Sequence, residues 1–127
     1  MELQYHGANC ISIATKQGRV VIDDNLQSVG LKSITKAEDI SLKTNTQIAD
    51  HPSRFVIDTP GEYEISGVSI NGVAAKAHMD KDDATSATIY TILAGDLRLC
   101  VTGHIAADLS EEQLEKIGLV DILVVPV

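Results

Sequence analysis

Short runs of apolar, largely β-branched residues, each closed by glycine or a polar turn, recur along almost the whole chain. Apolar and polar residues alternate over residues 9–15, as in a half-buried strand. The turn at 16–18 offers Gly18, and the apolar run 19–23 then returns, which predicts a β-hairpin. A chain with this pattern of short apolar runs and turns is confined to folds built mainly from β-sheets.

Further strands are predicted on either side of this hairpin. Asn71 and Gly72 are expected to form a tight turn or bulge that divides two of them, and Gly95-Asp96 is expected to join a second hairpin. Two segments are expected as exposed connections, the polar stretch 45–54 and the charged loop 79–86. The remaining predicted strands cover residues 3–6, 39–44, 55–58, 62–65, 68–70, 73–78, 87–94 and 97–101.

One helix is well specified by its end signals. Ser110 is a suitable N-cap and Gln113 completes a capping box, while Glu111 favours the positive end of the helix dipole. Gly118 is placed to end the helix. Strands in most of 127 residues, with a single helix, predict an α+β fold of β-rich sheet layers, and this length suits a single domain over residues 1–127.

Residues 120–127 form a valine-rich run interrupted only by Asp121 and Pro126. Such a run is typical of a strand covered on both faces. We therefore expect this strand to lie inside the sheet, or to gain its neighbour from another chain or from a part of the protein outside these residues. The corresponding partners are a second copy in a homodimer or a missing C-terminal half.

Composition excludes several classes of function. The formal charge is −8 and the pI about 4.7, which disfavours binding to nucleic acid. No apolar run reaches the roughly 18–20 residues of a membrane span, and no signal peptide is visible. The two cysteines, Cys10 and Cys100, each lie in an apolar run and are expected as buried thiols in a reducing compartment. A cytoplasmic location is expected.

The four histidines fall at or near the ends of predicted strands, where loops gather side chains into sites. Several carboxylates occupy similar positions, and histidine with carboxylate is the ligand set of zinc or manganese sites. No pair has diagnostic local spacing such as His-x-His. Four unrelated histidines therefore stand as the alternative. The histidines are His6, His51, His78 and His104, and the carboxylates include Asp23, Asp24, Asp50, Asp58, Glu62 and Asp80.

Taken together, four segments resemble the N-terminal half of a metallo-β-lactamase-fold protein, closest to the lactonase-like hydrolase branch. The opening YHGANCISI at residues 5–13 and GRVVIDD at 18–24 are similar to that branch's first strands. Residues 87–103 are similar to a later hairpin, and 109–127 to a helix followed by the strand DILVVPV. The resemblance implies one half of an αββα sandwich.

The same resemblance implies a metal site, with departures from the family's motif. The family carries His-x-His-x-Asp-His, where this chain reads TNTQIADH at residues 44–51. Asn45 and Gln47 replace the leading histidines, and neutral amides bind zinc less well than imidazole. Asp50-His51 matches the second half with one residue inserted, His78 falls near a later ligand, and His104 follows Gly103 where the family has aspartate. The metal candidates are therefore Asp50, His51, His78 and His104, holding zinc or manganese.

Three functions remain open at this point. The first is a hydrolase-like protein whose metal site is degenerate or lost. The second is an active metal-dependent hydrolase of small ester or phosphorylated substrates, in which a longer chain or a dimer completes the site. The third is an acidic β-rich interaction module. The residues point to no particular substrate and to no catalytic nucleophile.

Overall fold

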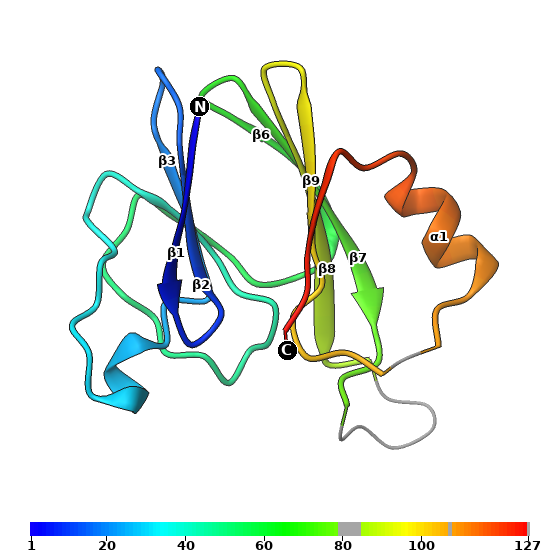
Figure 1. Ribbon diagram of the computed structural model, residues 1–127, viewed down its shortest axis with the longest axis horizontal. Coiled ribbons are helices and arrows are strands. Elements are labelled where there is room, and N and C mark those ends of the chain that lie inside the picture. The colour runs from blue at the N-terminus through cyan, green and yellow to red at the C-terminus, as the bar shows by residue number, and fades with distance from the viewer. Residues whose placement is uncertain (79–84, 107, 127) are drawn as a thin grey trace. The chain divides into compact units, whose positions relative to one another are not determined.

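The computed structural model describes residues 1–78, 85–106 and 108–126. Its contacts divide the chain into two compact units, Met1–Asp58 and Thr59–Val127, called unit 1 and unit 2 below. Each unit contains one five-stranded sheet, and the one α-helix among the described residues belongs to unit 2 (Figure 1). The β-rich α+β class predicted from the sequence is confirmed. The prediction of a single domain stays a prediction.

The sheet of unit 1 follows the chain in order from β1 to β5. Its first three strands are antiparallel, and the hairpin predicted around Gly18 is present. The later strands β3, β4 and β5 are parallel neighbours. Cys10, Val21 and Leu26 form a buried cluster. The elements are β1 (Glu2–Gly7), β2 (Cys10–Ala14), β3 (Arg19–Ile22), the 3-10 helix η1 (Leu26–Val29), β4 (Ile40–Leu42) and β5 (Phe55–Ile57).

The sheet of unit 2 has the order β10-β9-β8-β7-β6. All its neighbouring strands are antiparallel except β10, which runs parallel to β9. The hairpin predicted at Gly95-Asp96 joins β8 to β9. The elements are β6 (Gly61–Ile65), β7 (Val68–Ala75), β8 (Ala87–Ala94), β9 (Leu97–Val101), α1 (Glu111–Ile117) and β10 (Ile122–Val124).

Helix α1 begins with the predicted capping box. The Ser110 hydroxyl accepts a hydrogen bond from the Gln113 backbone N–H at 3.1 Å, and the Gln113 side chain accepts from the Ser110 N–H at 2.7 Å. Gly118 caps the C-terminal end. The Gln113 amide also donates to the Ala74 carbonyl at 2.9 Å, which ties the helix to β7. The local sequence therefore sets where the helix begins, and the same Gln113 attaches it to a distant strand.

The turn or bulge predicted at Asn71-Gly72 is wrong, because both residues lie inside the continuous strand β7 and its register is unbroken there. Glycine is required at position 72 for a steric reason. A Cβ at this position would lie 3.0 Å from the Thr88 methyl group and 3.2 Å from the backbone of Thr59 and Pro60. The glycine therefore permits a close approach between segments rather than a reversal of the chain. The predicted charged loop at 79–86 falls largely on residues 79–84, outside the described residues.

The strand predicted within residues 120–127 is present, and among the described residues it lies at a sheet edge and is partly exposed. β10 spans three residues at the edge of its sheet, pairing with β9 within the described residues. Leu123 in this strand is 60% exposed. Asp121 fixes its place, since its carboxylate accepts from the Arg98 N–H and its own N–H donates to the Arg98 carbonyl, both at 2.9 Å. The valine-rich composition indicated a strand but carried no information about its position in the sheet.

No helix among the described residues is long and apolar enough to cross a membrane.

Candidate functional site

The ends of three parallel strands in unit 1 bring polar side chains to one edge of the sheet. Ile22, Leu42 and Ile57 are register partners at the ends of β3, β4 and β5. The residues that follow them therefore lie at the same edge, where ligand sites of parallel sheets usually form. We call the group there the strand-end cluster. It consists of Asp23, Asp24, Lys43, Thr44, Asp50 and His51.

Asp23 links the ends of β3 and β4. Its backbone has a left-handed φ of 55°, which is uncommon outside glycine. In this conformation its carboxylate accepts hydrogen bonds from the Thr44 backbone N–H at 2.8 Å and from the Thr44 hydroxyl at 2.6 Å. Both residues are buried. The Asp23 charge is thus already satisfied by donors from the neighbouring strand.

Asp24 organises the segment that follows η1. One carboxylate oxygen, Oδ2, accepts four hydrogen bonds, from the Ser33 hydroxyl, the Ile34 N–H, and the N–H and hydroxyl of Thr35. Burial alone would raise the pKa of Asp24, but these hydrogen bonds outweigh it and lower the pKa below its usual value. The other oxygen, Oδ1, is buried and has no hydrogen-bond partner among the described residues.

His51 lies against Asp24 from the long connection between β4 and β5. Its Nε2 is 2.7 Å from the Asp24 main-chain oxygen and 3.9 Å from Oδ1 of the same residue. A carbonyl oxygen can only accept a hydrogen bond, so Nε2 carries the proton and donates. The imidazole is about nine-tenths buried. Its Nε2 lone pair is therefore not available to a metal in this arrangement.

Lys43 and Asp50 form an ion pair at the same edge. The Lys43 ammonium lies 2.7 Å from Asp50 Oδ1, and the lysine side chain is only 5% exposed, against 70% for the aspartate. The Lys43 ammonium, by hydrogen bond and by charge, lowers the pKa of Asp50. A buried ammonium group requires a partner of this kind. Asp50 thus holds a cation supplied by the chain itself.

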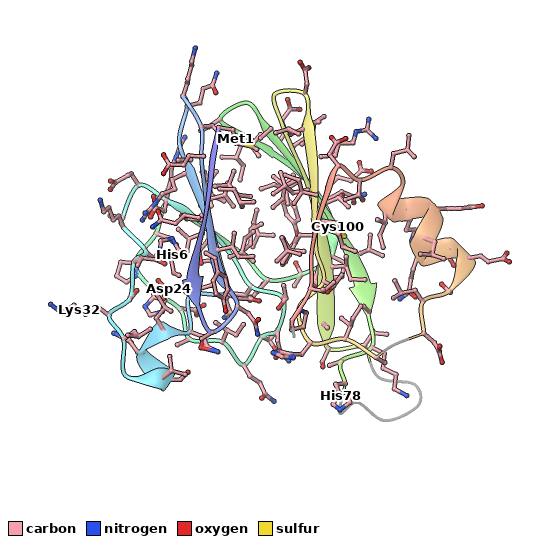
Figure 2. The ribbon with its side chains drawn as sticks, viewed as in Figure 1. Met1, His6, Asp24, Lys32, His78 and Cys100 are labelled. Atoms are coloured by element: carbon pink, nitrogen blue, oxygen red, sulfur yellow. The ribbon has the colours of Figure 1, made fainter. Side chains whose placement is uncertain are left out.

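The other two predicted metal ligands lie in unit 2. The His78 N–H donates to the His104 carbonyl at 3.2 Å, beside an isolated antiparallel bridge between Ala77 and Ile105. Figure 2 labels His78 here and Asp24 in unit 1. The four predicted residues are thus brought together in two pairs, one in each unit. Within residues 1–78, 85–106 and 108–126, no three His, Cys, Asp or Glu residues are grouped so as to hold a metal.

Two members of the cluster, Lys43 and Thr44, are not predicted from the sequence. The available signal was a lysine immediately after the apolar alternation of Ile40 and Leu42, a position where a charged residue is normally exposed. Its burial depends on β3 and β5 flanking β4, and on Asp50 lying within reach. Those contacts join segments that are separate in the sequence.

Comparison with known proteins identifies the family. The family described as "Beta-lactamase superfamily domain" matches residues 2–127, so the chain belongs to this superfamily. The predicted metallo-β-lactamase resemblance is thereby confirmed. A search of curated proteins found no match.

Solved structures of the superfamily share the fold. A Thermotoga maritima protein assigned as a zinc-dependent hydrolase of the metallo-β-lactamase superfamily matches with a TM-score of 0.69 and 21% identity, covering 95% of this chain. Zinc-bound PqqB from Methylobacterium extorquens gives 0.59 and 12% over 91%. A Cronobacter sakazakii metallo-β-lactamase with a HARLDQ motif gives 0.57 and 12% over 91%.

The chain is shorter than these proteins. It spans 58% of the Thermotoga and Methylobacterium chains and 70% of the Cronobacter chain. The predicted correspondence to part of a larger fold is therefore confirmed. At these identities the likeness concerns the fold.

Proposed function

We propose that this chain is a hydrolase-like member of the superfamily whose metal site has been lost and replaced by an internal network of hydrogen bonds and one ion pair. The observation that carries the proposal is the contact of 2.7 Å between the buried Lys43 ammonium and the Asp50 carboxylate. Asp50 is the carboxylate that the family resemblance places in the metal motif. A lysine cation at this carboxylate competes directly with a metal ion for the same negative charge.

The neighbouring motif positions support the same proposal. Asn45 stands where the motif has its first histidine, and its side-chain oxygen accepts a hydrogen bond from the Gln47 N–H at 2.9 Å. This closes a local turn and uses the oxygen within the loop. His51 donates from Nε2 to the Asp24 carbonyl. The donor set therefore does not fit a zinc or manganese ion, and we derive no catalytic step through one.

The proposal is tested by measuring metal content. Protein produced in medium with zinc and manganese, and purified without chelators, should contain fewer than about 0.1 metal ion per chain by mass spectrometry. The matched variant Lys43→Met removes the ammonium and keeps an unbranched side chain of comparable length. A metal content near one per chain in the unmodified protein, abolished in His51→Ala, would contradict the proposal.

A second candidate is an active metal-dependent hydrolase of small ester or phosphorylated substrates. It is favoured by the likeness to the Thermotoga protein and by the pairing of His78 with His104 at their backbones. In this case a further part of the chain, or a second copy in a homodimer, would supply the missing ligands. Stoichiometric zinc that disappears in both His51→Ala and His104→Ala, together with ester or phosphoester hydrolysis, would support it. Light scattering after size exclusion separates the dimer from the monomer.

A further inference from the structure

Helix α1 covers part of one face of the unit 2 sheet. Figure 1 shows the helix standing on one side of that sheet. Beneath it, Val73 and Ala75 of β7, Ala87 and Ile89 of β8 and Cys100 of β9 form a buried cluster packed against partly buried residues that include Ile117 and Val120. These sheet residues share a face because side chains alternate along each strand.

Near the C-terminal end of α1, the same face is built by two cross-strand rows, and there the Asn71 side chain donates to the Lys116 carbonyl at 3.4 Å. The register pairs Glu64 with Ser69, Ser69 with Leu93, and Leu93 with Arg98, which makes one row across β6, β7, β8 and β9. The next row contains Glu62, Asn71, Thr91 and Cys100, and its last member belongs to the buried cluster. Residues 69, 71 and 73 lie on one face of β7, and residues 70 and 72 lie on the other. Both rows therefore lie on the face that α1 partly covers.

A cavity of about 510 Å³ lies over these rows. Its walls include the sheet residues Glu64, Leu93 and Arg98, and Ile117 and Leu119 from the end of α1 and the residues after it. Volumes of roughly 300–1,000 Å³ are typical of sites for small ligands. We call this cavity the open groove. All its lining residues belong to unit 2.

Two sides of the open groove carry opposite charges, and Lys116 of α1, paired with Glu112 at 3.3 Å, also lines it. Glu62 and Glu64 lie on the edge strand β6, and Arg98 lies on β9, three strands away. Among the described residues, the side chains of these three form no hydrogen bond or ion pair, and all three are exposed. Neighbouring strands are spaced by about 4.8 Å, so the backbones that carry these charges are about 14 Å apart. Leu93, Ile117 and Leu119 supply apolar surface to the groove.

We propose that the open groove binds short dipolar peptides of about four residues with free termini. An extended chain advances about 3.3–3.6 Å per residue, so four residues bridge about 14 Å. The terminal ammonium would lie at Glu62 and Glu64, the terminal carboxylate would accept hydrogen bonds from the Arg98 guanidinium, and apolar side chains would contact Leu93 and Leu119. This site belongs to unit 2 and is independent of the strand-end cluster and of any metal.

The first test compares two forms of one peptide. Ala-Leu-Leu-Ala with free termini is titrated into the ¹⁵N-labelled protein, and the amide signals are followed by NMR. We expect saturable shifts at Ser69, Leu93 and Arg98, and binding at least about tenfold weaker for the N-acetylated, C-amidated form, because it lacks both charges. Absence of saturation up to about 10 mM peptide, or equal affinity for the two forms, would overturn the proposal.

The second test exchanges the charges across the groove. Glu62→Arg/Glu64→Arg, which reverses the charge of the β6 side, and Arg98→Glu should each weaken binding of the free peptide by about fivefold or more, because one peptide terminus then meets a like charge. The variant that combines all three substitutions restores opposite charges on the two sides and should bind at least about threefold more tightly than either parent variant, with the peptide reversed. All three residues are exposed, and the NMR spectrum of each variant reports its fold. A combined variant no better than its two parents would refute the charge arrangement.

Discussion

At the ends of its parallel strands unit 1 buries carboxylates and an ammonium group, whereas unit 2 buries aliphatic side chains beneath helix α1. In unit 1, Asp24 alone accepts four hydrogen bonds from the segment at 33–35. In unit 2, Ile89 is fully buried in the cluster under the helix. Ion pairing and hydrogen bonding therefore stabilise the strand-end cluster of unit 1, whereas burial of apolar surface stabilises the cluster beneath α1 in unit 2.

The difference has a consequence for how each unit responds to change. Removing a buried carboxylate leaves several donors without an acceptor, each at an appreciable energetic cost. Removing aliphatic atoms leaves a cavity, whose cost depends on how far the neighbours relax. Unit 1 should be sensitive to pH and charge, and unit 2 to side-chain volume. Five measurements can break or sharpen this comparison.

The largest effect is expected in the rate of thiol labelling, which reports on both units because each contains one buried cysteine. Burial, assisted by the charges of Asp24 and Asp23, raises the pKa of Cys10 to about 12, and burial raises that of Cys100 to about 11. Both thiols should react with a thiol reagent at pH 8 at least about 1,000-fold more slowly than in the unfolded chain. Because both pKa values are raised in the folded state, folding favours the protonated thiols. This contribution to the free energy of unfolding is fully present below the ordinary thiol pKa of about 8.5 and is lost as pH rises from there through the folded values. Rapid labelling of one cysteine in native buffer would show that its unit opens by itself.

The next effect is expected for Asp24→Ala in unit 1. The substitution leaves donors from Ser33, Ile34 and Thr35 without their acceptor, and we expect the free energy of unfolding to fall by about 4 kcal/mol in chemical denaturation. Labelling of Cys10 should accelerate more than labelling of Cys100. The control Glu38→Ala changes an exposed carboxylate in the same unit and should stay within about 0.5 kcal/mol.

The pH dependence of the same variant gives a second readout. Asp24 has a lowered pKa in the folded state. Its contribution to stability is therefore present above the unfolded value of about 3.9 and is lost as pH falls through the lower folded value. The unmodified protein should lose more stability than Asp24→Ala between pH 5 and the acid limit of folding. Parallel acid profiles for the two proteins would show that Asp24 does not carry this effect.

A smaller loss is expected in unit 2 for Ile89→Ala, about 3 kcal/mol, because the side chain is fully buried under α1. The matched control is Leu93→Ala. Residue 93 lies on the same strand and the same face, but in the open groove, where it is 36% exposed. We expect a loss below about 1 kcal/mol for this variant. Equal losses would mean that the groove is as well packed as the covered part.

The smallest effect is expected for Ser110→Ala, about 1 kcal/mol, since it removes one side of the capping box. Glu115→Ala, at an exposed position of the same helix, should change stability by no more than about 0.5 kcal/mol. Thermal unfolding followed by circular dichroism measures both. A loss as large as that of Ile89→Ala would show that attachment of the helix, rather than packing beneath it, holds unit 2 together.

The elements set by local signals were predictable from the sequence. Gly18, Gly95-Asp96 and Ser110 with Gln113 each specify a turn or a cap through neighbours within three residues. Gly72 was misread because its reason lies in Thr59 and Pro60, twelve or more residues away. The sequence left the place of β10 open for a related reason, since apolar composition is the same for a central strand and a half-exposed edge strand.

The candidate site was predictable only in part. The family resemblance identified the loop that carries Asp50 and His51, and the structure places both at the ends of the parallel strands. The burial of Lys43 and the proton on His51 Nε2 follow from contacts with Asp50 and with the Asp24 carbonyl, which local sequence patterns do not encode. Unlike the residue types, these contacts decide what the cluster is able to bind.

The close approach at Gly72 restricts which residues can be placed at position 72 when this protein is redesigned. Strand positions beside it, such as Ser69 and Asn71, face the groove and leave room for varied chemistry. At position 72 even one added methyl group must push the segment that enters β6, with Pro60, outward by a few tenths of an ångström. In a saturation mutagenesis library across β7, many residue types should therefore be tolerated at positions 69 and 71, and almost none but glycine at position 72.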